Sequence, residues 1–326
     1  MASSSSAGPD GRKGWAERVD GLAALRERAA FFGDGAERMF GVTHSPLGPT
    51  DRGVVVCASL NQDMAKNYRR EVVLARAMVA RGIAVQRFQY VGSGNSDGDY
   101  ASISFESMVR DALAAAEYLQ ARTGARRVAF FGGRFGALVA AAAAARFPRA
   151  PIVFLEPIND GRRFFREGIR TKVAQEMVGT TAARPTVAGY LERLREAGVL
   201  DILGYRVGRT LYDSSVGRTL VSELGASAAP RPVLMLQLTS EGTLRPGFED
   251  LRRLLIGAGL DVEVELIEGH ENWWFDEERD LRRLGSDGDV NHDAGDGRVA
   301  PPGITATLVE LVTSWLDRHL PAEVPA

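Results

Sequence analysis

The stretch Gly132-Gly133-Arg134-Phe135-Gly136 decides the expected fold. It follows the apolar run Val128–Phe131 and precedes an alanine-rich helical pattern from Ala137 to Ala145. A strand, a tight turn between glycines and a helix together form a nucleophile elbow, whose central residue sits on a strained backbone. The usual motif is G-x-S-x-G, and here Arg134 takes the place of the serine. Because a guanidinium stays protonated and cannot attack a carbonyl, we expect no serine acyl-enzyme.

Composition is that of an ordinary globular protein that can bury a large core. The chain has 326 residues, 45% hydrophobic and 25% charged, with a net charge of −2, so nothing indicates nucleic-acid binding. The single Cys57 fits a reducing compartment. Residues 1–20 begin Ser/Gly-rich and polar, which predicts a disordered tail rather than a signal peptide. No apolar stretch is long enough for a membrane span. We therefore expect a cytoplasmic protein.

Short apolar runs alternate with helical patterns, which predicts an α/β fold with a mostly parallel, doubly wound sheet. Residues 159–228 read mostly as helices with no clear strand, and we expect them to form a cap over the active site. The core would then comprise residues 21–158 and 229–326. Expected strands lie at 29–32 and 38–43 (an antiparallel entry pair), 53–58, 83–90, 128–131, 151–156, 232–238 and 262–267. Expected helices lie at 65–81, 107–123, 137–145, 161–177, 186–197, 248–258 and 305–319.

Arg134 would lie at a helix N-terminus, where free N–H groups and the helix dipole already favour an anion. A fixed cation there strengthens the site for a carboxylate, phosphate, phenolate or enolate. The alternative is an arginine tied to a neighbouring acid, such as Glu156 or Glu241, in a protein that does no chemistry. The functional hypothesis requires the guanidinium to face a cleft without being neutralised.

In an elbow fold the acid and the histidine follow the last two strands, in that chain order. Glu241 directly follows the run 232–238, and His270 directly follows 262–267. A neutral imidazole oriented by a carboxylate is a general base poised near physiological pH. We therefore expect Glu241 to orient His270, although Glu271 and Asp276 are competing acids and a surface-loop histidine is the alternative.

Weaker patterns surround this pair. The loop Ser59–Met64, with Leu60 and Asn61, is where an oxyanion N–H would come from, although the common His-Gly pair is absent. Trp273 and Trp274 predict an aromatic wall beside His270, or equally a packing contact between cap and sheet. The loop 287–293 has alternating oxygen ligands but lacks the glycine and glutamate of a calcium loop, so no metal is expected. Expected substrate-contacting residues are Leu60, Asn61, Ser93, Phe135, Glu156, Tyr205, Trp273 and Trp274.

With these elements placed, the chain resembles α/β-hydrolase-fold proteins, and more narrowly the exosortase-A-system-associated hydrolases of the second type. The resemblance runs from about residue 50 to 275. It implies the fold, and it implies that arginine at the elbow is a family feature, but it does not imply a demonstrated hydrolysis. His270 is not expected throughout that family. The matching stretches are Met64–Arg70, Gly92–Gly98, Gly133–Ala137, Glu156–Gly161 and Gly204-Tyr205.

The Ala/Arg/Gly-rich composition also resembles high-GC bacterial proteins, among which enzymes of this fold catalyse non-hydrolytic steps of specialised metabolism, including carbon–carbon coupling in enediyne pathways. The first functional hypothesis is a cofactor-free enzyme acting on a carbonyl-rich or phenolic small molecule, with Arg134 stabilising the anion and His270 moving the proton. The second is a hydrolase or acyltransferase in which His270 activates water. The third is a binding protein that has lost the chemistry. A homodimer is left open.

Overall fold

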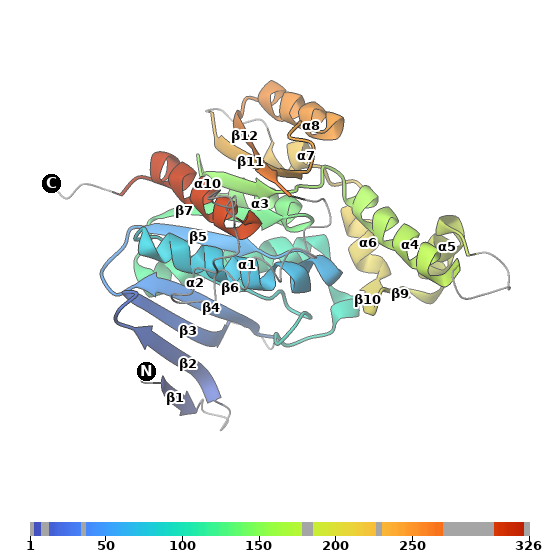
Figure 1. Cartoon of the computed structure of the whole chain (residues 1–326). Coiled ribbons are helices and arrows are strands. Elements are labelled where there is room, and N and C mark those ends of the chain that lie inside the picture. The colour runs from blue at the N-terminus through green and yellow to red at the C-terminus, as the bar shows by residue number, and fades with distance from the viewer. Residues whose placement is uncertain are drawn as a thin grey trace, which may run out of the picture.

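The computed structural model describes residues 3–7, 13–33, 37–177, 185–225, 230–269 and 303–322. In this part of the chain, a ten-stranded sheet has the order β1-β2-β3-β4-β6-β5-β7-β8-β11-β12. The strands from β6 to β12 run parallel, and β1 to β4 form an antiparallel extension (Figure 1). The parallel strands are β5 (Arg52–Cys57), β6 (Ala84–Phe88), β7 (Arg127–Gly133), β8 (Ile152–Leu155), β11 (Pro232–Thr239) and β12 (Asp261–Glu268).

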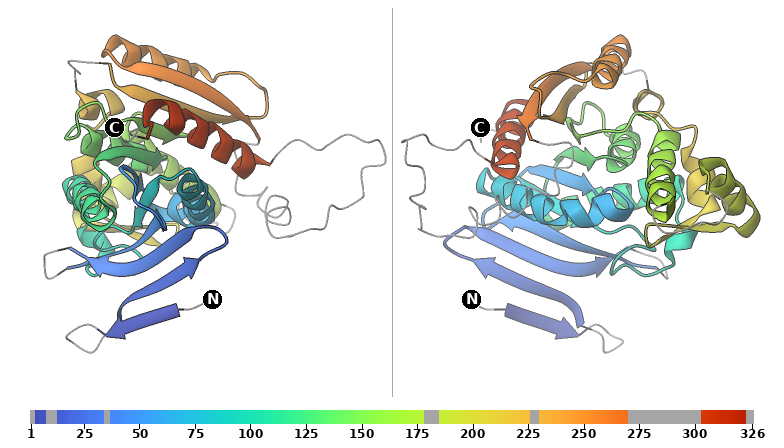
Figure 2. Two further views of the ribbon diagram at one scale, coloured as in Figure 1. Left: turned by 90° about the vertical axis from the view of Figure 1, so that its left-hand side faces the viewer. Right: turned by 45° about the vertical axis from the view of Figure 1, so that its right-hand side comes forward.

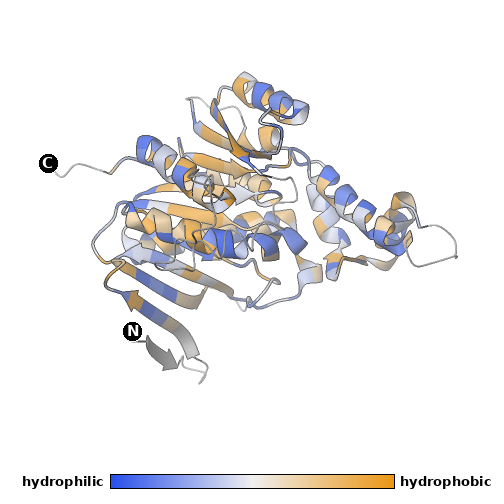
Figure 3. Ribbon diagram, viewed as in Figure 1, coloured by the Kyte–Doolittle hydropathy of each residue, from blue (hydrophilic) through white to orange (hydrophobic). Residues whose placement is uncertain are grey.

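Helices cover both faces of this sheet (Figure 2). One face packs on α1 (Asn61–Ala80) and α10 (Ile304–His319). The other packs on α2 (Phe105–Thr123), α3 (Gly136–Ala144) and α8 (Pro246–Gly257). The central strands are apolar on both sides, as strands buried under two helical layers must be (Figure 3). The predicted doubly wound fold is confirmed.

The segment between β8 and β11 projects to one side of the sheet (Figure 1). It contains α4 (Gly161–Met177), α5 (Val187–Ala197), α6 (Arg209–Ser215) and α7 (Leu220–Leu224). The expectation of no strand here was wrong, because β9 (Val199–Ile202) and β10 (Tyr205–Gly208) form an antiparallel hairpin. Its two-residue turn, Leu203-Gly204, has both φ angles positive, the geometry that a tight hairpin requires.

The expected disordered tail at 1–20 was also wrong over its described residues. β1 (Ser3–Ala7) and β2 (Lys13–Asp20) form strands that extend the sheet beyond β3 (Leu25–Phe32). The entry pair was correct, since β3 is antiparallel to β4 (Met39–Pro46). The polar composition did not predict these strands, because β1 pairs with β2 and β2 with β3 through backbone hydrogen bonds that any residue can form.

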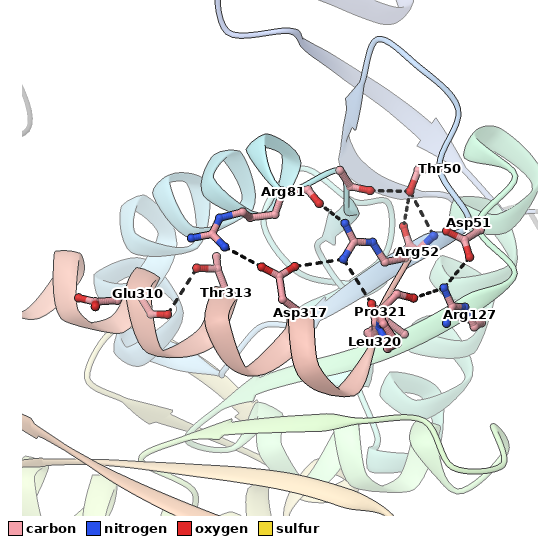
Figure 4. A network of polar contacts seen from close by, with 11 residues as sticks. Thr50, Asp51, Arg52, Arg81, Arg127, Glu310, Thr313, Asp317, Leu320 and Pro321 are labelled. Atoms are coloured by element: carbon pink, nitrogen blue, oxygen red, sulfur yellow. Dashed lines mark hydrogen bonds and ion pairs between the residues drawn. The ribbon is translucent and has the colours of Figure 1, made fainter. Parts of the chain in front are cut away.

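A polar network at the N-terminal ends of the parallel strands fastens the last helix to the sheet (Figure 4). Asp317 of α10 accepts hydrogen bonds from Arg52 at 3.1 Å and from Arg81 at 2.6 Å. Arg52 also donates to the carbonyl of Leu320 at 3.3 Å. This network lies at the end of the strands opposite to the elbow, so it bears on stability rather than on the site.

Candidate functional site

The elbow has the predicted geometry. Arg134 has φ +50° between β7 and α3, the left-handed backbone that strains a non-glycine residue. A Cβ on Gly132 would lie 2.4 Å from the Gly136 carbonyl oxygen, and one on Gly136 would lie 2.1 Å from that of Cys57. Neither position therefore accepts a side chain. Gly136 lets the turn pack against the end of β5, and Gly132 lets the start of α3 pack against β7. Together they fix where the Arg134 side chain begins.

The Arg134 side chain reaches a pocket of about 230 Å³ between α1, the elbow and the segment that joins β8 to β11, for which we keep the label cap. Its wall combines charged groups from α1 and α4 with apolar side chains, chiefly from the cap. The lining residues are Leu60, Asn61, Gln62, Asp63, Lys66, Arg134, Phe164, Phe165, Glu167, Gly168, Thr171, Ile202 and Leu203. Leu60 and Asn61 thus lie where the sequence predicted substrate contacts.

The guanidinium of Arg134 is held by two carboxylates. Its Nε donates to Asp63 Oδ2 at 3.2 Å, and an Nη donates to Glu167 Oε2 at 3.1 Å. Burial alone would lower the pKa of Arg134, but the charges of Asp63 and Glu167 raise it, so the guanidinium stays protonated. The expectation of an unneutralised guanidinium was wrong. The expected acids were also wrong as direct partners, because neither Glu156 nor Glu241 forms an ion pair with Arg134.

Glu156 instead interacts with Leu238 and Arg245. It is 6% exposed, has φ +47° at the end of β8, and accepts a hydrogen bond from the Leu238 N–H at 2.6 Å. Arg245 pairs with its other oxygen. Burial raises the pKa of Glu156, and the Arg245 hydrogen bond partly opposes this. Because Glu156 does not line the pocket, its predicted role in substrate contact finds no support in the geometry.

Other predicted residues lie away from the pocket wall. Ser93 is 2% exposed, and its hydroxyl faces Met64 Sδ at 3.9 Å. Phe135 is fully buried among Phe105, Phe164 and Phe165, so its side chain builds the core beneath the cap. Tyr205 packs its ring against Tyr100 at 5.9 Å. None of the three lines the Arg134 pocket, so their contact with substrate stays a prediction.

Two backbone donors belong to residues at the elbow and at the start of α1: Phe135 follows Arg134, and Leu60 lines the pocket with it. Within the described part of the chain, the N–H groups of Leu60 and Phe135 donate to no backbone or side-chain oxygen. In an elbow fold these are the positions that form the oxyanion hole, one after the nucleophile position and one from the preceding strand–helix loop. Among the described residues, both N–H groups thus remain available as hydrogen-bond donors near a cation that lines the pocket.

His270, Trp273, Trp274 and the loop 287–293 lie outside the described residues. Glu241 is exposed in the turn after β11, where its N–H donates to Thr239 Oγ1 at 3.1 Å. Of the residues that the structure describes, no group of three His, Cys, Asp or Glu side chains could hold a metal ion, and no helix is long and apolar enough to cross a bilayer.

Sequence reasoning missed Asp63, Lys66 and Glu167. Asp63 and Lys66 stand on the first turns of α1, immediately after the loop that was expected to supply an oxyanion donor. That position alone could have identified them as pocket residues. Burial lowers the pKa of Lys66, and the charge of Asp63 opposes this. Glu167 comes from the cap helix α4, and nothing in its local sequence connects it with the elbow.

Together, the sheet order and the elbow define an α/β-hydrolase fold. A family model described as serine aminopeptidase, S33, matches residues 50–185. No curated protein matches the chain in sequence.

Solved structures of the same fold are distant in sequence. Est1E from Butyrivibrio proteoclasticus has 12% identity and a TM-score of 0.57, covering 90% of this chain and 98% of its own. A lipase in an open form has 16% identity and a TM-score of 0.56, covering 91% and 100%. DcsB in complex with a substrate analogue has 13% identity and a TM-score of 0.53, covering 98% and 99%. At such low identity, these likenesses concern the fold alone.

Proposed function

We propose that the protein is a cofactor-free enzyme of specialised metabolism that converts a carbonyl-rich or phenolic small molecule without a serine acyl-enzyme. The reaction would be an addition, an elimination or the formation of a carbon–carbon bond. The observation that supports this most directly is Arg134 itself, which occupies the nucleophile position of an intact elbow and lines a pocket. A permanent cation at this point stabilises negative charge and cannot form an acyl bond.

The charges of the pocket limit what it can bind. Its lining includes two cations, Arg134 and Lys66, and two carboxylates, Asp63 and Glu167. These four charges cancel, so an incoming anion would compete with the two carboxylates for Arg134 and displace one of them. Glu167 is the better candidate, because its side chain is 34% exposed against 14% for Asp63. Without Glu167, two cations and one carboxylate remain in the pocket. Their net charge of +1 suits a monoanion.

Glu167 also has a second partner ready. Its other oxygen accepts a hydrogen bond from Arg163 Nε at 2.8 Å, one helical turn away on α4. When Glu167 releases Arg134, it keeps this surface ion pair and turns toward solvent. The cap helix would thus exchange its own carboxylate for the anionic group of the substrate, and Asp63 would keep the guanidinium oriented.

The proton transfer is assigned to His270 on sequence grounds. The imidazole would take a proton from a hydroxyl or an acidic carbon of the substrate, and the electron pair of that bond would remain as a phenolate or an enolate. Arg134 and the N–H groups of Leu60 and Phe135 would stabilise the resulting oxyanion. General base catalysis contributes about 10²–10⁴-fold, and fixed charges add several kcal/mol. That suffices for a substrate that is already activated.

A hydrolase or acyltransferase with a His270-activated water is the second candidate. The matching family model bears the name of a serine aminopeptidase, and water could attack a carbonyl bound at the same oxyanion donors. A binding protein is the third candidate, favoured by the two carboxylates that neutralise Arg134. The first candidate converts substrates without hydrolysis, the second hydrolyses or acylates them, and the third leaves them unchanged. One experiment therefore separates the three candidates.

The test is a substrate panel analysed by mass spectrometry. Purified protein is incubated with phenols, β-keto acids and generic esters, alongside the Arg134→Ala and His270→Ala variants. The expected result is conversion of a phenolic or β-keto compound that both variants abolish while their circular dichroism is unchanged. Glu192→Gln, at an exposed cap ion pair, is the matched control and should retain activity. Ester turnover alone would support the hydrolase, and full activity in either variant would remove the mechanism.

A further inference from the structure

A second cavity, of about 250 Å³, lies between α1 and the adjoining strands β4 and β6. α1 crosses these strands on one face of the sheet (Figure 1). The cavity shares no lining residue with the Arg134 pocket, because the two lie on different sides of the first turns of α1. Its lining is mostly apolar: Phe40, Gly41, Val42, Ala58, Met64, Ala65, Tyr68, Glu71, Arg87, Phe88 and Gln89.

Arg87 is the unusual member of this lining. It is 5% exposed, and its guanidinium carbon lies 4.4 Å from the centroid of the Tyr68 ring. One Nη donates to the Tyr68 carbonyl at 3.3 Å, and the buried Nε has no hydrogen-bond partner among the described residues. Buried guanidinium donors without acceptors are costly, and native proteins rarely leave them so. The Nε of Arg87 therefore lacks a hydrogen-bond acceptor among the described residues.

Glu71 does not supply that acceptor. Its Oε2 lies 3.8 Å from Arg87, beyond hydrogen-bond distance. Glu71 is 9% exposed, and burial raises the pKa of its carboxyl, although the charge of Arg87 opposes this. Glu71 therefore accepts no hydrogen bond from the Arg87 guanidinium. A ligand carboxylate could accept two parallel N–H groups from Arg87, the strongest geometry available to arginine.

We propose that this cavity binds an apolar monocarboxylate, with the carboxylate on Arg87 and the hydrocarbon body against Phe40, Val42 and Met64. At about 30 Å³ for a water-sized group, the cavity holds a ligand of about eight such groups, which is the size of a medium-chain fatty acid or an aryl-alkanoic acid. Tyr68 is 44% exposed at the rim, so the stacked ring is accessible from solvent. This site is independent of the proposed reaction at Arg134.

The test is isothermal titration calorimetry of the full chain with octanoate, and with 1-octanol as the uncharged comparison. The expected result is saturable binding of one octanoate that weakens at least tenfold in Arg87→Gln and persists within twofold in Arg134→Gln. The alcohol should bind at least tenfold more weakly than the acid. Equal binding of the alcohol, loss of octanoate binding in Arg134→Gln, or no binding at all would overturn the proposal.

Ala65→Trp provides a second variant that does not disturb the buried charges. Ala65 is an exposed residue of α1 that lines the cavity, so a large ring there can occupy the space while the helix is retained. Octanoate binding should fall at least tenfold with unchanged circular dichroism. Binding as tight as in the wild type would place the ligand elsewhere and contradict the proposal, even if Arg87→Gln failed to fold.

Discussion

Removing the charge of Glu167 should strengthen anion binding at the elbow. In the proposed exchange, a substrate anion competes with Glu167 for Arg134. The ion pair is 3.1 Å long, with side chains 24% and 34% exposed. Solvent-accessible pairs of this kind contribute about 0.2–1 kcal/mol. Glu167→Gln removes the charge that competes, so a ligand anion gains up to about 1 kcal/mol, or about fivefold in affinity.

The assay is titration calorimetry with 4-hydroxybenzoate, a phenolic carboxylate that serves as a probe of the Arg134 pocket. Glu167→Gln should bind it up to about fivefold more tightly than the wild type. Glu192→Gln removes an equally simple carboxylate from an exposed pair on α5 and should leave the affinity unchanged. Unchanged or weaker binding in Glu167→Gln would refute the competition. The carboxylate would then be part of the binding surface and not a stand-in for the ligand.

Three further outcomes follow from the geometry. Arg134→Ser restores the usual elbow motif, so a fluorophosphonate should label this variant. The double variant Arg134→Ser/His270→Ala should not be labelled. Equal labelling of the two variants would show that His270 is not the base. Asp317→Ala should lower the free energy of unfolding in urea by about 1–3 kcal/mol, because Arg52 and Arg81 lose the carboxylate that accepts their hydrogen bonds. A loss smaller than the error of the measurement would contradict the role of this network in fastening α10 (Figure 4). Glu27 of β3 forms a hydrogen bond with His44 of β4, and this bond is the main reason why the Glu27 pKa falls from 4.5 to about 2. A carboxylate with a lowered pKa stabilises the folded state above pH 4.5, and this stability is lost as the pH falls toward 2. Between pH 4.5 and 2, the free energy of unfolding of the wild type should therefore fall more steeply than that of Glu27→Gln. Parallel pH dependences of the two proteins would contradict the lowered pKa of Glu27.

Much of the fold could be predicted because its determinants are local. The glycines around Arg134 specify a turn that only small residues allow, and the apolar runs of the central strands have the pattern of a sheet covered on both faces. The range Gly161–Met177 was predicted as a helix and is α4. Strand β2 could not be predicted in this way, because it depends on the backbone edge of β3 and not on its own composition.

The site was less predictable than the fold because its contacts join distant segments. The elbow position of Arg134 is a local property, whereas its partners Asp63 and Glu167 come from helices on either side of it in the sequence. Phe135 follows Arg134 along the chain, but its ring packs against Phe164 and Phe165 and does not line the pocket. The roles of His270 and Glu241 stay predictions.

A crystal structure with bound 4-hydroxybenzoate tests the central claim most directly. The account predicts the ligand carboxylate or phenolate within hydrogen-bond distance of the Arg134 guanidinium, with Glu167 turned to Arg163 and Asp63 still in place. A bound ligand that leaves the pair between Arg134 and Glu167 intact, and that touches neither the guanidinium nor the N–H groups of Leu60 and Phe135, would contradict it.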